Sequence, residues 1–495
     1  MPGQRRDHWP SHAGPEALAG PREQQLESNF QATTIVDQNQ RARSISAFRQ
    51  WMTVAILLLL NVLAFVDRSI IALMVQPIKR SLQVSDFQIG LVQGLAFASF
   101  YAVCALPLGW ALDRFPKRPI VYVCITIWSV ASAACGLAHS FVHLLFARFA
   151  VGFGEATLTP ASYVFISGIF PKARLSTALS IYGLGGSFGA AIAMIVGGLI
   201  VSMTAGTVTV PLLGPVESWR FVFFVTGLPG VVLALLIFLV PDVDSRGDAA
   251  ATREKVPDAS AFVRSRRAFL TCHFLGFSLL AMMAGGATSW LPTFLIRHHG
   301  WTSAQAGAGI AVTILFLTAG VMTGGIVVDA LTRRGMRNAH FRYHMVLTIF
   351  AFLFAIAAFA FASPYLNLLL IGLALGCSAM AGVGASALQI VTPPALRGRI
   401  SAMYLMAVSI IGTGGGPLVV AVFTDFILKD EAKVGTSIAL TYALFAPLAF
   451  LCFFFGSRFM LGAIDQLEAT EQPSGSMTRF SPKSTVNGDP QCAQP

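Results

Sequence analysis

The chain alternates long apolar runs with short clusters of charged and turn-forming residues. Twelve runs are long enough to cross a hydrocarbon core about 30 Å thick as helices. They lie at approximately residues 52–76, 88–112, 119–138, 142–168, 174–202, 219–240, 269–296, 304–330, 342–362, 366–391, 399–424 and 438–460. A membrane-spanning β-barrel would alternate apolar and polar residues, which these runs do not do. The pattern therefore predicts an all-α polytopic membrane protein with twelve transmembrane helices.

Polar segments divide this pattern into five parts. The longest interior polar segment, residues 241–268, lies between the sixth and seventh runs, and we interpret it as a cytoplasmic linker. It separates an N-terminal six-helix bundle, residues 51–240, from a C-terminal six-helix bundle, residues 269–462. Residues 1–50 and 463–495 are polar, and we expect both to be disordered cytoplasmic tails.

Composition supports this interpretation and orients the protein. The chain is 55% hydrophobic and 12% charged, and this charged fraction is about half that of ordinary soluble domains. With the N-terminus inside, the cytoplasmic connections carry seventeen Lys and Arg residues and the opposite connections carry six. Because positive residues concentrate in cytoplasmic loops, we expect both termini on the cytoplasmic side of the cell (inner) membrane. The same bias explains the net charge of +11, so no nucleic-acid partner is expected.

A charged motif, G-x-x-x-D-x-x-x-[KR]-R, occurs twice at one constant offset. Its residues are Gly109, Asp113, Lys117 and Arg118 after the second run, and Gly325, Asp329, Arg333 and Arg334 after the eighth. Two further segments repeat: SDFQIG (85–90) matches TSAQAG (302–307), and ARLSTA (173–178) matches GRISAM (398–403). Equivalent connections indicate two pseudo-symmetric bundles, which in membranes is typical of alternating access to a site between the halves.

These residues resemble the major facilitator superfamily, whose loop signature between helices 2 and 3 is close to G-x-x-x-D-R-x-G-R-R. Here Lys117 stands for the first arginine of the closing pair and Pro116 for the usual glycine. Segments within 61–102, 147–171 and 290–300 are most similar to spinster-type transporters and their bacterial relatives. This resemblance implies the major facilitator fold, a sphingoid or lysophospholipid substrate, and protons in the coupling.

The repeated motif is interpreted as a latch at the cytoplasmic end. A carboxylate at a helix end, followed by bases, can contact the other half only when the inner gate is shut. The resemblance implies that Asp113 docks against helix 11 and Asp329 against helix 5, with Arg174 and Arg399 as candidate partners. Arg114 completes the set of gating residues. Positive-inside bias alone explains Arg118 and Arg334, but not an acid repeated in register.

Four ionisable residues lie well inside apolar runs: Asp67, Arg68, Arg148 and Glu155. Each charge costs about 2.5–3.5 kcal/mol at a helix centre, so each should face the protein interior and find a partner. The rise per residue places Asp67 and Arg148 at nearly one level, with Glu155 two turns further along the face of Arg148. The spacing therefore predicts a polar wall of a cavity.

We expect Asp67 or Glu155 to gain and lose a proton, while Arg148 alternates between that carboxylate and an anionic substrate group. The alternative is that Asp67 and Arg148 form a permanent structural pair. Further candidates for substrate binding are Arg68, Tyr101, Trp290, Gln389 and Tyr404.

The chain is thus predicted to be a monomeric, proton-coupled secondary active transporter for a small amphipathic or organic anionic solute, and not an enzyme. It has no P-loop and no H-E-x-x-H motif, and we expect no cofactor and no metal site. Two alternatives stay open. The Asp-Arg pair in the first run and the pattern R-x-x-x-G-x-x-E-A in the fourth also occur in organic-anion symporters, so the substrate can be an aromatic or sugar acid. A membrane receptor or sensor that does not transport its ligand is the other.

Overall fold

The computed structural model describes residues 45–204, 207–210, 214–242, 259–393 and 396–471. The predicted tails, apart from their ends nearest the bundles, and most of the predicted linker lie outside these residues. The described part contains twelve helical segments that are long and apolar enough to cross a membrane, as predicted. We number them spans 1 to 12. Span 1 runs from Ala47 to Ala72, a few residues before each predicted limit, and span 12 continues to Gln466.

The first six spans form the N-terminal half. They comprise α2 (Ala47–Ser69) with η2 (Ile70–Ala72); α4 (Asp86–Gly90), η3 (Leu91–Leu95) and α5 (Ala96–Arg114); α6 (Lys117–Gly136); α7 (Phe141–Glu155) and α8 (Leu158–Ile169); α9 (Lys172–Met203); and α10 (Ser218–Leu233) with η4 (Ala234–Leu239). The short helix α3 (Val75–Leu82) joins spans 1 and 2. An antiparallel hairpin, β1 (Thr207–Val210) and β2 (Gly214–Glu217), joins spans 5 and 6.

The last six spans form the C-terminal half. They comprise α13 (Arg267–His299); α14 (Ser303–Arg333); α15 (Ala339–Ala358); α16 (Pro364–Cys377) and α17 (Ala381–Val391); α18 (Arg397–Ala407), η6 (Val408–Gly414), α19 (Gly415–Val422) and η7 (Phe423–Leu428); and η8 (Glu431–Lys433) with α20 (Val434–Glu471). The short helix α12 (Ala259–Ser265) precedes span 7.

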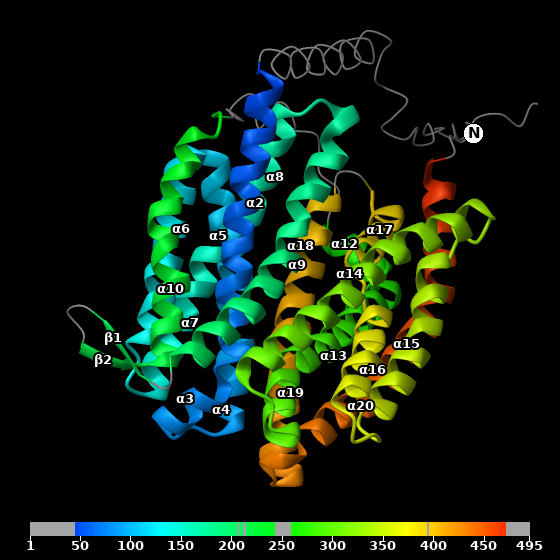
Figure 1. The fold of residues 1–495 in the computed structure, drawn as a ribbon. Coiled ribbons are helices and arrows are strands. Elements are labelled where there is room, and N and C mark those ends of the chain that lie inside the picture. The colour runs from blue at the N-terminus through cyan, green and yellow to red at the C-terminus, as the bar shows by residue number, and fades with distance from the viewer. Residues whose placement is uncertain (1–44, 205–206, 211–213, 243–258, 394–395, 472–495) are drawn as a thin grey trace, which may run out of the picture.

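Figure 1 shows the two halves side by side, with α2 beginning and α20 ending at the same end of the molecule. We call this the terminal end, and the end that carries α3, the hairpin and η8 the distal end. Both copies of the charged motif lie at the terminal end, because α5 and α14 are the second and eighth spans and run in the same direction. The repeat therefore has the placement that a duplicated fold requires.

The repeat also determines how spans 2 and 8 begin. Ser85 and Thr302 are N-caps that accept hydrogen bonds from the main-chain N–H groups of Gln88 and Gln305, both at 3.2 Å. In return, the amide oxygens of Gln88 and Gln305 accept from the N–H groups of Ser85 and Thr302, both at 3.0 Å. These reciprocal bonds are capping boxes, which satisfy main-chain donors that a helix start leaves unpaired.

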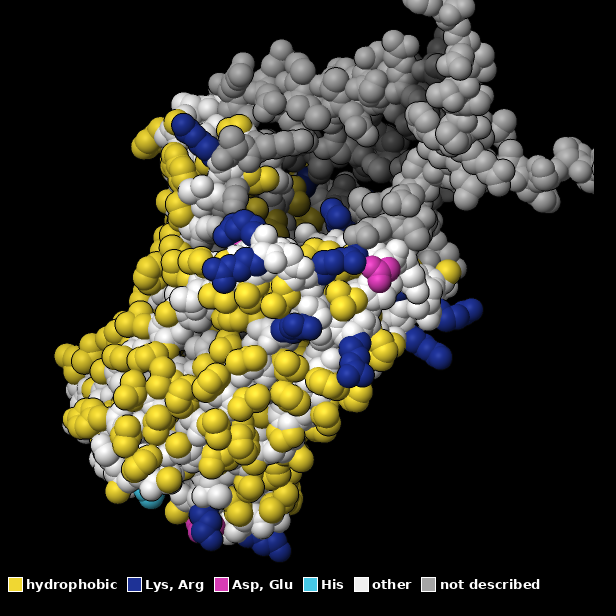
Figure 2. Space-filling view, turned by 90° about the vertical axis from the view of Figure 1, so that its right-hand side faces the viewer, with side chains coloured by type: hydrophobic (Ala, Val, Ile, Leu, Met, Phe, Trp, Pro, Cys, Tyr) yellow, Lys and Arg dark blue, Asp and Glu magenta, His cyan; other side chains and the backbone are white. Residues whose placement is uncertain are grey.

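Apolar and charged side chains are distributed over the surface as a bilayer requires. Figure 2 shows a broad apolar face over the C-terminal half, with most of its Lys and Arg side chains gathered toward the terminal end. Large apolar side chains such as Leu315, Met322 and Ile326 are about 65% exposed there. Such a surface is favourable against lipid and unfavourable against water.

Several spans are interrupted. Ala156 and Thr157 separate α7 from α8 within span 4, and Pro160 follows in the first turn of α8, where its ring lies opposite the Ala156 carbonyl. Span 10 is interrupted between α16 and α17, and spans 2 and 11 contain π-helical turns, η3 and η6. Irregular backbone at membrane depth is tolerated where protein surrounds it, and π-turns occur often at functional sites.

The halves touch each other in their distal portions. Between spans 5 and 8, a Cβ added at Gly198 would lie 2.6 Å from the Ser303 carbonyl oxygen, and between spans 2 and 11 one at Gly90 would lie 2.8 Å from that of Pro417. Nearer the terminal end of the same helices, a Cβ at Gly109, Gly183 or Gly325 would meet no atom within 4 Å. The main chains of the two halves are thus in contact toward the distal end, and these three glycines face open space.

The hairpin is tied to this end by Glu217. Its carboxylate accepts hydrogen bonds from the Ser81 hydroxyl, from Trp219 Nε1 at 2.7 Å and from Arg220 Nε at 3.2 Å. Partial burial opposes the charge, but these donors and the Arg220 guanidinium hold the pKa of Glu217 below its usual range.

Gly198→Ala is expected to destabilise the protein, because the added methyl group has no space against the start of α14. Overpacking of this kind costs roughly 1–3 kcal/mol. Gly183→Ala, in the same helix, adds a methyl group to open space and should leave stability unchanged or slightly raised. Thermal unfolding of both purified variants measures the difference. Equal midpoints would contradict the close contact between spans 5 and 8.

Candidate functional site

The four charged residues predicted inside the membrane lie together in the N-terminal half, but they pair differently from the expectation. Arg68 Nη2 donates to Glu155 Oε2 at 2.7 Å, which joins the last turn of α2 to the end of α7. The Glu155 side chain is 1% exposed, whereas that of Arg68 is 31% exposed. The sequence predicts Arg148 as the partner of the carboxylates; in the structure Arg68 binds Glu155.

Aromatic rings surround this pair. The Arg68 guanidinium carbon lies 4.4 Å from the ring centre of Phe97, 4.7 Å from that of Phe65 and 5.4 Å from that of Tyr101. A cation over aromatic faces is stabilised by their quadrupoles. Tyr101, a predicted lining residue, is therefore part of the site. We call these five residues the Arg68–Glu155 site.

Asp67 and Arg148 form a second layer that is fully buried. Asp67 Oδ1 accepts from Ser132 Oγ of α6 at 2.9 Å, and Arg148 Nη1 donates to the main-chain oxygen of Asp67 at 3.3 Å. Within the described residues, Asp67 Oδ2, Arg148 Nε and Arg148 Nη2 have no hydrogen-bond partner. Arg148 thus holds the backbone of α2 rather than binding either carboxylate directly. The predicted permanent ion pair between Asp67 and Arg148 is not formed in this geometry.

Three other predicted lining residues have different environments. Trp290 is fully buried and donates from Nε1 to the Pro417 carbonyl at 2.9 Å, so it joins spans 7 and 11. Tyr404 is 3% exposed and its ring packs 4.9 Å from that of His273. Gln389 is exposed on α17. None of these three contacts the Arg68–Glu155 site through a hydrogen bond or ring contact in the described part of the chain.

The predicted latch residues lie at the terminal end, and the structure describes only some of their side chains. The exposed gating residues there are Arg114, Arg174, Asp329, Arg333, Arg334 and Arg399. Lys117 is buried and Arg118 is half-buried, and the side chain of Asp113 lies outside what the structure describes. The described ion pairs include none that joins the two halves at this end. The latch stays a prediction for a different state of the protein.

Instead, the halves are joined by charges at the distal end. Asp86 is fully buried and accepts two hydrogen bonds from Arg297, at 2.6 and 2.8 Å, and one from Lys79 at 2.6 Å. Glu431 pairs with the same two cations, at 2.7 Å from Lys79 and 3.2 Å from Arg297. Asp86 and Lys79 belong to the N-terminal half, and Arg297 and Glu431 belong to the C-terminal half.

A fifth residue reinforces this contact. Asp425 Oδ2 of η7 accepts a hydrogen bond from the main-chain N–H of Phe87 at 2.7 Å. An acid from span 11 therefore sits at the N-terminus of span 2, where the helix dipole favours negative charge. We call Lys79, Asp86, Arg297, Asp425 and Glu431 the distal lock. The sequence does not reveal this lock, because Lys79 and Arg297 lie in connections where positive charge is expected without any specific partner.

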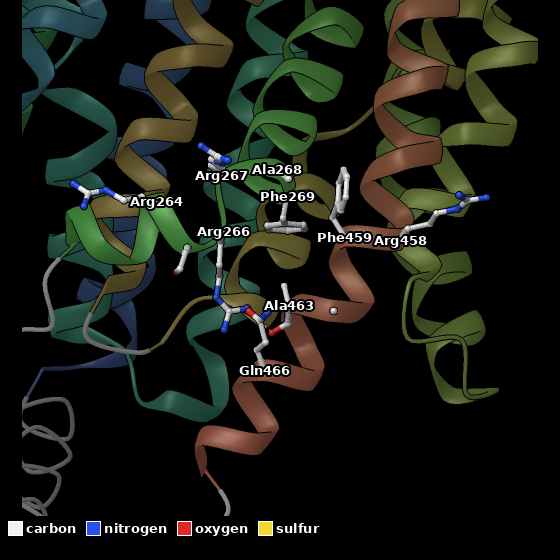
Figure 3. A pocket seen from close by; sticks show the side chains of 11 residues that line it. Arg264, Arg266, Arg267, Ala268, Phe269, Arg458, Phe459, Ala463 and Gln466 are labelled. Atoms are coloured by element: carbon white, nitrogen blue, oxygen red, sulfur yellow. Dashed lines mark hydrogen bonds between the residues drawn. The ribbon is translucent and has the colours of Figure 1, made fainter. Parts of the chain in front are cut away.

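A cavity of about 600 Å³ lies at the terminal end between α12, α13 and α20. Figure 3 shows that Arg266 turns toward Ala463, to whose carbonyl it donates, while Arg264 and Arg458 point away in opposite directions. Burial lowers the pKa of Arg266. Because the guanidinium groups do not converge on one point, the cavity offers no anion site comparable to Arg68.

The chain can now be compared with known proteins. The Major Facilitator Superfamily model matches residues 57–417. This chain belongs to that superfamily. The crystal structure of a bacterial homolog of the human lysosomal transporter Spinster, in an inward-facing and unoccupied conformation, is similar with a TM-score of 0.72. It is 25% identical, and the match covers 85% of this chain and 99% of that one.

Curated relatives point to the same kind of protein. An MFS-type efflux pump of Mycolicibacterium smegmatis is 27% identical over 83% of this chain and 93% of its own length. A D-galactonate transporter of Escherichia coli is 26% identical over 58% of this chain and 69% of its own length. The predicted membership in the superfamily and the spinster-type resemblance are confirmed. This protein is a multi-pass membrane transporter. Its relatives are transporters rather than enzymes.

Asp86→Asn is expected to open the distal end. The substitution removes the buried charge that binds both Arg297 and Lys79 and leaves them the exposed Glu431 as their remaining acid. A buried charge left without any partner costs about 3–5 kcal/mol; with Glu431 still present we expect a smaller loss, and about 1.4 kcal/mol already shifts an equilibrium between two states tenfold. Pulsed EPR distances between spin labels at exposed Arg80 and Ala432 measure the change, which should appear as a longer population.

Lys433→Gln is the matched control at the same end. It breaks an exposed pair in which Lys433 and Asp430 are 3.6 Å apart, and such pairs contribute at most about 1 kcal/mol. Its distance distribution should equal that of the unmodified protein. The same distribution in Asp86→Asn would show that the distal lock does not hold the halves together.

Proposed function

We propose that this protein is a proton-coupled secondary active transporter of the cell (inner) membrane, and that it moves a lysolipid-like or sphingoid-like amphiphile with an anionic head. The observation that carries the proposal is the Arg68–Glu155 pair. A partly exposed guanidinium rests on a buried carboxylate and is surrounded by three aromatic rings. Arginine binds carboxylate and phosphate groups through its planar fork, and the rings offer apolar surface beside it.

Exchange of partners at Arg68 couples substrate to proton. When Glu155 takes up a proton its charge is lost, and Arg68 can bind the anionic head of the substrate instead. When the substrate leaves, Arg68 pairs with Glu155 again and the proton is released. Arg68, and not Arg148 as expected from the sequence, is then the residue that alternates between a carboxylate and the substrate anion. Arg148 fixes the backbone of α2. Asp67, behind Arg68, is the second candidate for the proton.

The two ends of the molecule differ in the way that alternating access requires. The distal lock closes one end, and the motif glycines Gly109 and Gly325 have open space at the other. The positive-inside bias puts the terminal end in the cytoplasm. The structure then corresponds to an inward-facing state, an assignment supported by its similarity to the inward-facing bacterial homolog of Spinster.

A sugar acid is the second candidate substrate. The relationship to a D-galactonate transporter favours it, because a carboxylate would bind Arg68 in the same way. The two candidates differ in their tails: an amphiphile uses the apolar rings beside Arg68, and a sugar acid requires hydroxyl-binding partners.

Thermal shift decides between them. A ligand that binds the folded state stabilises it by RT ln(1 + [L]/Kd), about 2.7 kcal/mol at a hundredfold excess over Kd. We expect lysolipids with anionic heads to raise the unfolding midpoint, and Arg68→Gln to remove this effect. Stabilisation by galactonate alone would replace the lipid proposal with the sugar-acid one. Ligand binding without counterflow in proteoliposomes would identify a receptor.

Glu155→Gln is expected to uncouple transport from protons. The amide keeps the shape of the side chain and a weaker acceptor for Arg68, but it cannot bind a proton. Counterflow of labelled substrate should therefore persist in proteoliposomes, and proton-driven accumulation should be lost. Asp67→Asn tests the other carboxylate in the same assay. Asp465→Asn, which breaks an exposed pair with Arg337, should behave like the unmodified protein. Full coupling in both Glu155→Gln and Asp67→Asn would refute the proton scheme.

A further inference from the structure

Span 10 is broken in a place where two buried histidines meet it. Residues 378–380 separate α16 from α17, and the break contains no proline. The main-chain oxygen of Ala379, in the break, lies 3.2 Å from His344 Nε2. The oxygen of Gly384, one turn further, lies 2.9 Å from His273 Nε2. Main-chain groups at membrane depth require partners, and here side chains of spans 7 and 9 provide them.

His344 approaches carbonyl oxygens with both ring nitrogens. Nδ1 lies 3.0 Å from the main-chain oxygen of His340, and Nε2 faces Ala379. A neutral imidazole carries one N–H, so it can donate to only one of these oxygens; its other nitrogen then faces an oxygen without a hydrogen. An imidazolium donates to both. His344 is fully buried, so it has no exposed position in which one nitrogen contacts solvent.

Burial and the neighbouring carbonyl oxygens act on the charge of His344 in opposite directions. Removal from water disfavours a cation. The ring centres of Phe277, Tyr343 and Phe453 lie 4.9, 5.1 and 5.6 Å from that of His344, the first two in edge-to-face geometry. These rings fix the orientation of the imidazole between its two carbonyl oxygens. No carboxylate forms an ion pair with His344 within the described residues, so its charge depends on the two carbonyl oxygens.

The other titratable groups around His344 come from each element packed against it. They are His340 and Tyr343 on α15, His273 on α13, Tyr404 against His273 on α18, Cys377 at the end of α16 and Tyr442 beside Ser378 on α20. Asp329 of the second charged motif interacts electrostatically with His340, and Asp329 is exposed at the terminal end. His340 precedes His344 by one helical turn. Among the described residues no hydrogen bond joins the side chains of Asp329, His340 and His344, so these groups are neighbours of the break and not a connected chain.

We propose that His344 is a proton-binding site of the C-terminal half, and that its imidazolium clamps the broken segment of span 10 to α15. With the proton bound, His344 donates to the oxygens of His340 and Ala379 and holds the break in the observed shape. When the proton leaves, His344 keeps one N–H and can donate to only one of the two oxygens, so in the tautomer with the hydrogen on Nδ1 the break is no longer held at Ala379. This goes beyond the proposed function, because it requires neither a particular substrate nor a proton on Glu155.

Nitrogen NMR of the intact protein tests the proposal directly. The chain has nine histidines and only one Tyr-His dipeptide, at 343–344. Carbonyl-¹³C tyrosine combined with ¹⁵N-histidine therefore assigns His344 without any substitution. We expect its side-chain signals to show two protonated nitrogens at low pH and one at high pH, with a reversible transition between the two forms in the folded protein. A single neutral tautomer at every pH at which the protein stays folded would overturn the proposal and leave His344 a structural residue.

His344→Gln provides the functional arm of the test. Glutamine keeps one donor and one acceptor but cannot become a cation, so the pH dependence of counterflow should be reduced. His139→Gln, an exposed histidine outside the cluster, is the control and should leave that dependence unchanged. An unaltered pH profile in folded His344→Gln would contradict the clamp. Absence of transport with every substrate tested would refute the proposed function, and the NMR result would still decide the state of His344.

Discussion

The ion pair between Asp86 and Arg297 is the contact on which the observed arrangement of the two halves depends. It joins them through two short hydrogen bonds, with the carboxylate fully buried. Burying two charges has a desolvation cost that nearly offsets their attraction, whereas removing one partner leaves the other unpaired at a high cost. A contact of this kind adds little net stability to the closed state over a state in which water solvates both charges. It suits a carrier, whose two states must be close in free energy.

The fold is pseudo-symmetric, but its charges are not. Ser85 and Thr302 cap spans 2 and 8 with the same geometry, yet the residue after the cap is Asp86 in one copy and Ser303 in the other. Asp86 forms an ion pair with the opposite half, and Ser303 packs its main chain against Gly198 of the opposite half. In the same way, buried carboxylates lie in the N-terminal half and buried histidines in the C-terminal half. Duplication accounts for the equivalent helices of the two halves. The buried charged and titratable residues lie at positions where the two copies differ in sequence.

The sequence predicts the twelve spans, their directions and the cluster of charges, because bilayer thickness and the cost of buried charge act on each segment separately. It does not predict which partners bind. Asp67 and Arg68 are neighbours about 100° apart around the axis of α2, and the rotation of α2 about its axis, which decides which one meets Glu155, is set by packing in the assembled fold. Asp86 and Arg297 lie 211 residues apart, and only the assembled fold brings them together. The break in span 10 has no proline to mark it, and the sequence expectation considered only Asp, Glu, Lys and Arg inside apolar runs, so it passed over His273 and His344.

The Arg68–Glu155 site and the distal lock are connected by a short piece of chain. Arg68 is in the last turn of α2, η2 follows directly, and α3 carries Lys79 to Asp86 and Glu431. Arg148 holds the main chain at Asp67, immediately before Arg68, so the end of α2 has a fixed position while Arg68 binds Glu155. The segment from Arg68 through η2 to α3 therefore leads directly into the lock. In the proposed cycle a change of partner at Arg68 would act on the lock through this backbone, without a long-range network of side chains.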